Sequence, residues 1–332
     1  MPGEADPPSG MITVYVYKDG VTKTADRIEP QWLDPGSGIT LWVDVVQPTP
    51  EEGQQILAET FHFHPLSVED ALSEIHQPKV EPYDHYLYII LHGIDFQASQ
   101  HEFSTRDVDF FLGANYLVTV HDGGSRSIAK LKELCAQHAH ILEEGPVALT
   151  HRIIDSMIDN YEPEMAEIEE QMDQLEEDAI LGAGDNLMRP ILEVKRDLAS
   201  LRRVLIPQRD AVGRLARREF PQISTEMAYR FRDVYDHLVR YADEATIFQD
   251  RMTGILEGYL SAISNRLNQV MKVLTVVSTI VLPMTVLTGL WGINVPLPHF
   301  PGSDGAQFWW LVGIMFGITI GMLAAFRWRH WI

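Results

Sequence analysis

The chain has 332 residues, of which 45% are apolar, and its mean hydropathy of −0.08 is typical of a protein that lies mostly in water. Its formal net charge of −21 argues against nucleic acid as a partner, because phosphate binding needs a basic surface. The single cysteine, Cys135, excludes an internal disulfide framework and a cysteine-based zinc site, and it fits a reducing compartment.

The chain begins with a segment that predicts no regular structure. Residues 1–10, MPGEADPPSG, lack the basic and apolar regions of a signal peptide, and we expect a disordered tail. Residues 11–146 are expected to form a cytoplasmic α/β domain. Strand-like patterns occupy 11–20, 39–46, 86–96 and 109–122, and helix-like patterns occupy 49–61 and 127–142.

Residues 147–222 are expected to form a helical hairpin whose two arms carry opposite charge. Acidic residues dominate 155–185, the sequence LGAGDN makes the turn, and basic residues recur from Arg189 to Arg218. Two interpretations of this pattern stay open. Either the arms are solvated and joined by mutual salt bridges, or the acidic arm attracts cations or the cytoplasmic end of the second membrane span.

A long stalk helix is predicted over residues 223–291. Only Gly254 and Gly258 interrupt the helical pattern before Pro283. A helix of about 65 residues is roughly 100 Å long. It cannot be stable alone, so we expect it to pack against copies of itself or against other elements.

Two segments have the composition of membrane spans. Residues 273–291 and 308–326 contain no Asp, Glu, Lys, Arg or His. About 19 residues form roughly 28 Å of helix, which matches a hydrocarbon core of about 30 Å. The alternative, two buried core helices of a soluble domain, would need a large soluble core around the last part of the chain.

The basic residues around these spans predict their orientation. Lysine and arginine precede the first span and occur in the tail 327–332, whereas the connecting segment 292–307 has neither. By the positive-inside rule, the connecting loop lies outside the cell and both termini lie in the cytoplasm.

Polar and small side chains recur on one face of the first span, at alternating steps of three and four residues. The positions on this face are Asn268, Met271, Thr275, Ser278, Leu282, Thr285 and Gly289, of which Met271 and Leu282 are large and apolar. One interpretation is a helix–helix contact through small residues. The other is a pore lined by one such stripe from each subunit, because polar groups in a membrane face protein or water. Composition alone does not separate the two.

A pore of this composition would suit a hydrated divalent cation. Magnesium prefers oxygen ligands and gives up its water reluctantly, so rings of Asn268, Thr285 and Asn294 would hold it through its water shell. Carboxylates would bind more tightly and slow the exit of the ion. Hydrophobic rings at Met271, Leu274 and Leu282 would gate the pore by excluding water.

The sequence resembles a known family. SNRLNQVMKVLTVVSTIVLPMT, followed by LTGLWGIN, is similar to the CorA family of divalent metal cation transporters, which have two C-terminal spans and a G-x-N motif at the end of the first. YRFRDVYDH and FHPLSVEDALSEIHQPKVEPYDHYLYIIL extend the resemblance over nearly the whole chain beyond residue 10. It implies a funnel-shaped homopentamer in the cell membrane, with an α/β cytoplasmic domain and a pore formed by the long helix.

The resemblance also implies roles for individual residues. Gly292, Ile293 and Asn294 would form the outer selectivity motif. The conduit would be lined by Asn268, Met271, Leu274, Ser278, Leu282, Thr285 and Gly289. Acidic pairs between neighbouring cytoplasmic domains would bind regulatory metal ions, with Asp70 and Asp233 as the main candidates and Glu69 and Glu257 as weaker ones.

The transported ion stays open between Mg²⁺, with Co²⁺ as a companion, and Zn²⁺. The motif is followed by VPLPHFPGSDGAQFWW, in which Asp304 is the sole acid, and this neutral loop resembles the zinc-transporting ZntB branch more than the magnesium branch. His299 alone is a poor zinc site. The alternative function is a membrane-anchored sensor whose spans form a non-conducting bundle. No nucleophile–base pair, phosphate-binding loop or H-E-x-x-H motif indicates an enzyme.

Overall fold

The computed structural model describes residues 11–73, 77–97, 102–181, 187–293 and 303–331. It divides into two compact units. The first comprises Met1–Asp178 and Gly184–Leu256, and the second comprises Ala179–Ala183 and Glu257–Ile332. The predicted tail over residues 1–10 lies outside the described residues.

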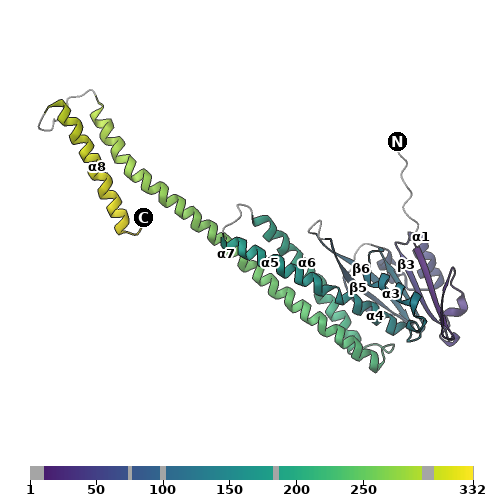
Figure 1. Ribbon diagram of the computed structural model, residues 1–332. Coiled ribbons are helices and arrows are strands. Elements are labelled where there is room, and N and C mark those ends of the chain that lie inside the picture. The colour runs from purple at the N-terminus through teal and green to yellow at the C-terminus, as the bar shows by residue number, and fades with distance from the viewer. Residues whose placement is uncertain (1–10, 74–76, 98–101, 182–186, 294–302, 332) are drawn as a thin grey trace, which may run out of the picture. The chain divides into compact units, whose positions relative to one another are not determined.

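A seven-stranded sheet forms the centre of the first unit (Figure 1), in the order β2-β1-β3-β7-β6-β5-β4. The strands are β1 (Met11–Lys18), β2 (Val21–Ala25), β3 (Thr40–Val46), β4 (Lys79–Pro82), β5 (Tyr86–Gln97), β6 (Glu102–Gly113) and β7 (Tyr116–His121). Only the β3–β7 pair is parallel among the described strand pairs. These two central strands are almost continuously apolar and buried, as strands covered on both faces are.

The predicted strands are confirmed, but the structure differs from the prediction at β6 and β7 and at the two edges of the sheet. The segment 109–122 contains the end of β6 and all of β7, joined by a tight turn. Gly113 stands at this turn, where an added Cβ would lie 2.2 Å from the Tyr116 ring, so the ring occupies the space that a side chain would need. The edge strands β2 and β4 were not predicted, because neither VTKTA nor KVEP has a strong apolar pattern.

One face of the sheet is covered by the segment after β3. It contains helix α1 (Pro50–Gly53), the π-helical turn η3 (Gln54–Thr60) and helix α2 (Pro65–Leu72), with the short 3-10 helices η1 (Pro30–Leu33) and η2 (Pro35–Ser37) before β3. Thr49 and Glu52 form a capping box that starts α1. Buried aromatic rings fill the core beneath them. The centre of the Phe63 ring lies 4.3 Å from that of the stacked Phe111 ring and 4.5 Å from that of the Tyr86 ring.

The opposite face is covered by helices α3 (Arg126–Gln137), α4 (Pro146–Asp159) and α6 (Met188–Ala216), with the 3-10 turn η4 (Ala139–Ile141) after α3. Gln208 of α6 is fully buried and fastens this helix to the sheet. Its Oε1 accepts a hydrogen bond of 2.7 Å from the backbone N–H of His92, and the Tyr161 hydroxyl donates to the His92 carbonyl at 2.9 Å. These neutral hydrogen bonds hold the base of the hairpin.

The predicted hairpin over 147–222 differs from the structure in its first arm. Residues 146–159 form α4 against the sheet, and the arm itself is α5 (Tyr161–Leu181), which pairs with α6. The acidic residues of α5 form ion pairs mainly with elements other than the basic helix α6. Arg251 of α7 (Thr225–Trp291) donates to Asp173 at 2.6 Å and to Glu176 at 2.5 Å.

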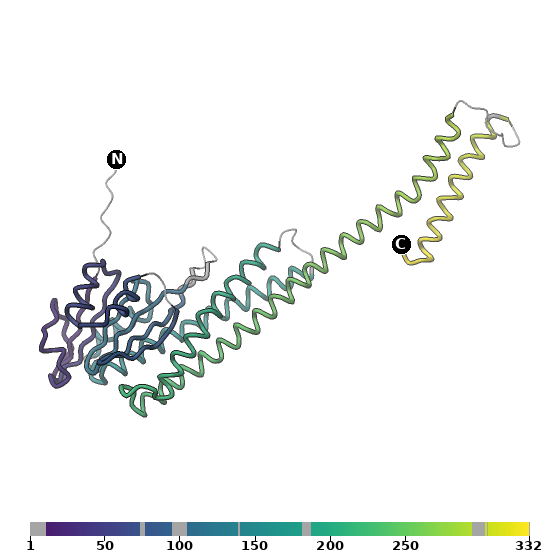
Figure 2. The backbone as a smooth tube through the Cα atoms, turned by 180° about the vertical axis from the view of Figure 1, so that it is seen from behind, coloured from purple at the N-terminus to yellow at the C-terminus, as the bar shows by residue number. Residues whose placement is uncertain are grey.

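The long helix is confirmed as α7, a continuous helix of 67 residues. Within the first unit it packs alongside α5 and α6, which lie beside it in both views (Figures 1 and 2). Its buried positions follow a heptad repeat with steps of three and four residues. They are Phe231, Val234, Leu238, Tyr241, Ala245, Phe248, Met252 and Ile255.

A buried charge network lies between the central strands and α3. Asp44 is 0% exposed and accepts hydrogen bonds from Thr119 at 2.5 Å and from the His121 Nε2 at 3.1 Å, and it forms an ion pair with Lys132. Gly123 N–H lies 3.0 Å from the other His121 ring nitrogen, so both ring nitrogens have polar partners. Burial opposes ionisation of Asp44, but the contacts with His121 and Lys132 outweigh it and lower the pKa of Asp44.

We predict that Asp44→Asn lowers the free energy of unfolding by roughly 3 kcal/mol, because it breaks a buried ion pair and leaves Lys132 without its counter-ion. A carboxyl group with a lowered pKa stabilises the fold above its unfolded pKa of about 3.9, and that stabilisation is lost as pH falls through the folded pKa. Thermal unfolding of the full chain in detergent, followed by circular dichroism, should therefore show a gap between wild type and variant that is constant from neutral to mildly acidic pH and narrows at strongly acidic pH. The exposed Asp26→Asn is the control, and equal stability of the two variants would contradict the prediction.

Candidate functional site

Two helices are long and apolar enough to cross a membrane. They are α7, through its C-terminal part, and α8 (Asp304–Trp328). The most apolar stretch of α7 is only 6% buried and that of α8 is 0% buried. This exposure disagrees with the alternative of two core helices, whose apolar side chains would be covered by the protein.

In the second unit, α8 runs beside the end of α7 in both views (Figures 1 and 2). One face of α7 is half-buried there, at Val276, Ile280, Pro283 and Leu287. These positions continue the heptad repeat that is buried between Phe231 and Ile255.

The predicted pore stripe lies on the other side of the helix. Ser278, Leu282, Thr285 and Gly289 each follow a half-buried position by two residues, which is a rotation of about 200° around an α-helix. All seven positions that the resemblance assigns to the conduit, and also Thr275, are exposed in the single chain. The three large apolar ones are widely exposed, with Met271 at 59%, Leu274 at 58% and Leu282 at 68%. The stripe is therefore free to face other copies of the chain or a water-filled space.

The threonine hydroxyls of this segment already have acceptors for their protons. Thr275 donates to the Met271 carbonyl at 2.7 Å, and Thr285 donates to the Val281 carbonyl at 3.0 Å. Such bonds to the preceding turn satisfy the hydroxyl proton within the helix. The lone pairs of the same oxygens then remain available to accept from a water molecule or to face a cation.

The helix ends at the predicted selectivity motif. Gly292 N–H donates to the Thr288 carbonyl at 3.0 Å, and Ile293 N–H donates to Leu290 at 3.4 Å. An added Cβ on Gly292 would lie 3.3 Å from the Thr288 oxygen, so glycine lets the chain turn close to the last carbonyls of α7. Asn294, like His299 and most of the connecting loop, lies outside the described residues.

The predicted regulatory acids have different surroundings. Asp70 on α2 is partly buried, and its carboxylate pairs with Lys79 of β4 at 2.7 Å. Lys79 also pairs with Glu81 at 3.0 Å and lies 5.6 Å from the centre of the Tyr88 ring. A tethered ammonium group thus already balances the charge with which Asp70 would attract a metal ion. Sequence reasoning missed this cation, because no pattern relates Lys79 to Asp70.

Asp233, Glu69 and Glu257 are exposed, the first and last on α7 and Glu69 on α2. Asp233 lies near Asp155 of α4. Burial raises the pKa of Asp155, and the neighbouring carboxylates of Asp159 and Asp233 raise it further against the opposing effect of His151. Among the described residues, no group of three or more His, Cys, Asp or Glu side chains is arranged to hold a metal ion.

Another acid, Asp109, is buried close to Asp70 and Lys79. Asp109 of β6 accepts a hydrogen bond of 2.5 Å from the Tyr88 hydroxyl, and burial raises the pKa of Asp109 to about 8. Burial and the adjacent carboxylate also raise the pKa of Tyr88. Burial thus favours the neutral form of Asp109, which is held in the core by its hydrogen bond with Tyr88.

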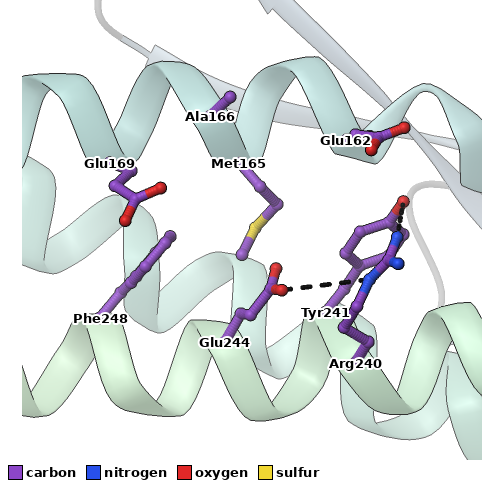
Figure 3. Close-up of a pocket in the computed structure, with 8 residues that line it drawn as sticks. All are labelled: Glu162, Met165, Ala166, Glu169, Arg240, Tyr241, Glu244 and Phe248. Carbon is purple, nitrogen blue, oxygen red and sulfur yellow. Dashed lines mark hydrogen bonds and ion pairs between the residues drawn. The ribbon is translucent and has the colours of Figure 1, made fainter.

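An acidic groove lies between α5 and α7 in the first unit (Figure 3), with a volume of about 350 Å³. Its lining residues are Glu162, Met165, Ala166, Glu169, Arg240, Tyr241, Glu244 and Phe248. Arg240 donates to the Tyr241 hydroxyl at 3.1 Å and lies 4.0 Å from the Glu244 carboxylate. The groove is a polar surface feature whose arginine already has partners.

The sequence pattern of the family described as "CorA-like Mg2+ transporter protein" matches residues 37–328. The chain belongs to the CorA family. It is 32% identical to YfjQ of Bacillus subtilis over 291 residues, which are 87% of this chain and 89% of that protein. It is 29% identical to the cobalt/magnesium transport protein CorA of Thermotoga maritima over 298 residues, covering 89% of this chain and 84% of that protein.

Solved structures share the fold of this CorA-family chain. The complete structure of the CorA magnesium transporter from Methanocaldococcus jannaschii aligns with a TM-score of 0.83 and 23% identity, over 97% of this chain and 99% of that one. The cytoplasmic domain of ZntB from Vibrio parahaemolyticus aligns with a TM-score of 0.63 and 17% identity, over 77% of this chain and 99% of that one. The predicted architecture of an α/β domain, a long helix and two C-terminal apolar helices is confirmed.

A divalent cation that binds Asp70 would compete with the Lys79 ammonium group for the charge of its carboxylate. We therefore predict that Lys79→Met increases the stabilisation of the full chain by Mg²⁺ or Co²⁺, because the competing ammonium group is gone and Asp70 and Glu81 keep their negative charge. Thermal unfolding in detergent, with and without the metal, measures this effect. Lys23→Met, an exposed lysine on β2, is the matched control, and equal metal-induced shifts in wild type and Lys79→Met would contradict the prediction.

Proposed function

We propose that this chain assembles as a homopentamer and carries divalent metal cations across the cell membrane through a pore lined by the stripe on α7. The chain's membership of the CorA family supports transport, and the name of its Thermotoga maritima relative indicates cobalt and magnesium. The observation that carries the pore is the position of the stripe. The polar face of α7 lies opposite the face beside α8, and it is exposed with respect to the described residues of the single chain.

In such an assembly each position of the stripe forms a ring around the axis. Asn268, Ser278 and Thr285 would supply rings of oxygen ligands, which suit an ion that keeps its water shell. Met271, Leu274 and Leu282 would supply apolar rings between them, which impede ions when the pore is narrow enough to lose its water. With both kinds of ring, the pore would let hydrated cations pass at the oxygen rings and would stop them at the apolar rings when these lose their water.

The selectivity motif Gly292-Ile293-Asn294 would form the outer entrance. Both termini and the α/β domain would then lie in the cytoplasm, as the basic residues at the other ends of the spans favour. Asp70 and Asp233, with Glu69 and Glu257 as weaker candidates, would sense the metal inside the cell where neighbouring copies meet. Asn268 and Met271 would stand at the cytoplasmic end of the conduit.

The transported ion is Mg²⁺ or Co²⁺ in one version of this proposal and Zn²⁺ in the other. The neutral segment after the motif favours Zn²⁺, and the names of the relatives favour Mg²⁺ and Co²⁺. The alternative function is a membrane-anchored sensor with a non-conducting helix bundle, in which the stripe would only join helices. Crosslinking that stops at dimers, without cation flux, would support this alternative.

We predict that Thr285→Val reduces divalent cation flux severalfold, because valine keeps the shape of threonine but removes the oxygen from its ring. The measurement is metal uptake by liposomes that contain the purified full chain. Thr319→Val is the matched control, since Thr319 also donates to the preceding turn, at 2.8 Å from the Met315 oxygen, but lies on α8 instead of on the stripe of α7. Flux that falls equally in both variants would argue against a pore lined by this face.

We also predict that Asn294→Ala impairs uptake, because it removes the amide from the proposed entrance. Competitive uptake of Mg²⁺ and Zn²⁺, with and without a pH gradient, then identifies the ion and shows whether protons are coupled to its movement. Uptake no greater than in protein-free liposomes would refute transport altogether.

A further inference from the structure

The unit that holds the two apolar helices differs in charge from the rest of the chain. Its long segment, residues 257–332, contains four Lys or Arg and two Asp or Glu residues, whereas the whole chain has a net charge of −21. The basic residues are Arg266, Lys272, Arg327 and Arg329. They precede the apolar part of α7 and follow that of α8, so they gather at one end of an antiparallel pair.

The end of α8 is a defined turn. His330 has a left-handed backbone conformation, with φ of 57°. Its N–H donates to the Arg327 carbonyl at 3.1 Å, and the N–H of Trp331 donates to the Phe326 carbonyl at 2.9 Å. This pair of bonds is the Schellman arrangement that ends many helices, usually with glycine at the left-handed position. A histidine there is strained, so other contacts must hold the turn.

Two contacts of the turn are visible. The Trp331 ring stacks on that of Phe326 with 5.8 Å between the ring centres, which is the apolar contact expected for this kind of cap. Lys272 of α7 donates to the His330 carbonyl at 3.2 Å. The end of α8 is thereby fastened to α7 at the level where the basic residues lie.

The turn at the end of α8 carries an aromatic and basic surface. Trp328 is 83% exposed between Arg327 and Arg329 in the sequence, and Trp331 is 41% exposed. Tryptophan has an apolar ring and one N–H donor, and it is favoured at the boundary between lipid and water. Arginine recognises phosphate oxygens with two parallel hydrogen bonds. An anionic phospholipid offers both partners at once, a phosphate group and adjoining acyl chains.

We propose that the residues Lys272, Arg327, Trp328 and Arg329, here named the basic collar, form a binding surface for the headgroups of anionic phospholipids. The proposal rests on the membrane location of the two helices and not on ion transport. Basic residues beside an anionic membrane surface each contribute attraction that falls off within a Debye length. The collar therefore selects lipids by charge, and its selectivity declines with increasing salt.

The test uses the full chain in vesicles of phosphatidylcholine and phosphatidylglycerol without divalent cations. After mild detergent extraction, native mass spectrometry measures the ratio of the two lipids retained by the protein, relative to their ratio in the vesicle. Wild type should be enriched in phosphatidylglycerol. Each charge removed in Arg327→Gln and Arg329→Gln should lower this enrichment about fivefold, the equivalent of about 1 kcal/mol for a basic residue at an anionic surface.

Two further variants separate recognition from folding. The double variant Arg327→Lys with Arg329→Lys keeps the charge and should keep most of the enrichment, and the exposed Arg203→Gln of α6 should not change it. Absence of enrichment in wild type, or full enrichment in the double glutamine variant, would overturn the proposal. So would loss of subunit crosslinking in the glutamine variants with enrichment unchanged, since the collar would then bind an acidic segment of another copy. Cation flux measured in vesicles of phosphatidylcholine alone tests the proposed transport separately.

Discussion

The heptad repeat of buried positions on α7 is the constraint on which the rest of the structure depends. The helix has 67 residues, and most of its stability comes from the packing of one face against other elements. From Phe231 to Ile255 that face is filled by large side chains against α5 and α6, and from Val276 to Leu287 the same repeat is half-buried. Commitment of one face to packing leaves the opposite face available for a different purpose, and the polar and small residues of the span lie there.

The sequence predicted the α/β domain, the long helix and the two apolar helices, because each has a pattern with a clear physical cause. The apolar runs around Val43 and Val118 can be satisfied only in a covered sheet, and 273–291 has no charge to keep it in water. The edge strands β2 and β4 were missed, since their side chains are half in water and pairing with β1 and β5 decides their conformation. The beginning of the hairpin was misplaced, because the amphipathic pattern of α4 is equally compatible with packing on a helix or on a sheet.

The part of the candidate site that could be predicted from the sequence is the stripe on α7, because its residues recur at a helical period. A stripe at steps of three and four residues is visible in any helical sequence, and the structure shows that this one faces away from α8. The cluster around Asp70 was not predictable, because Lys79 reaches it through the return of the chain into β4. The charge network of Asp44, His121 and Lys132 likewise joins three elements that are distant in the sequence. Such contacts depend on the register of the sheet, which a single sequence leaves open.

The hairpin of α5 and α6 is fastened at two places by interactions of different chemistry. At its base, Gln208 and Tyr161 hold the backbone of His92 through neutral, buried groups. Farther along α5, Arg251 holds Asp173 and Glu176 through partly exposed charges. Screening at physiological ionic strength acts over about 8 Å and weakens only the second kind. The stiffness of the hairpin is therefore graded along its length, with a base that is indifferent to dissolved ions and an outer part whose hold on α7 follows the ionic strength of the surrounding solution.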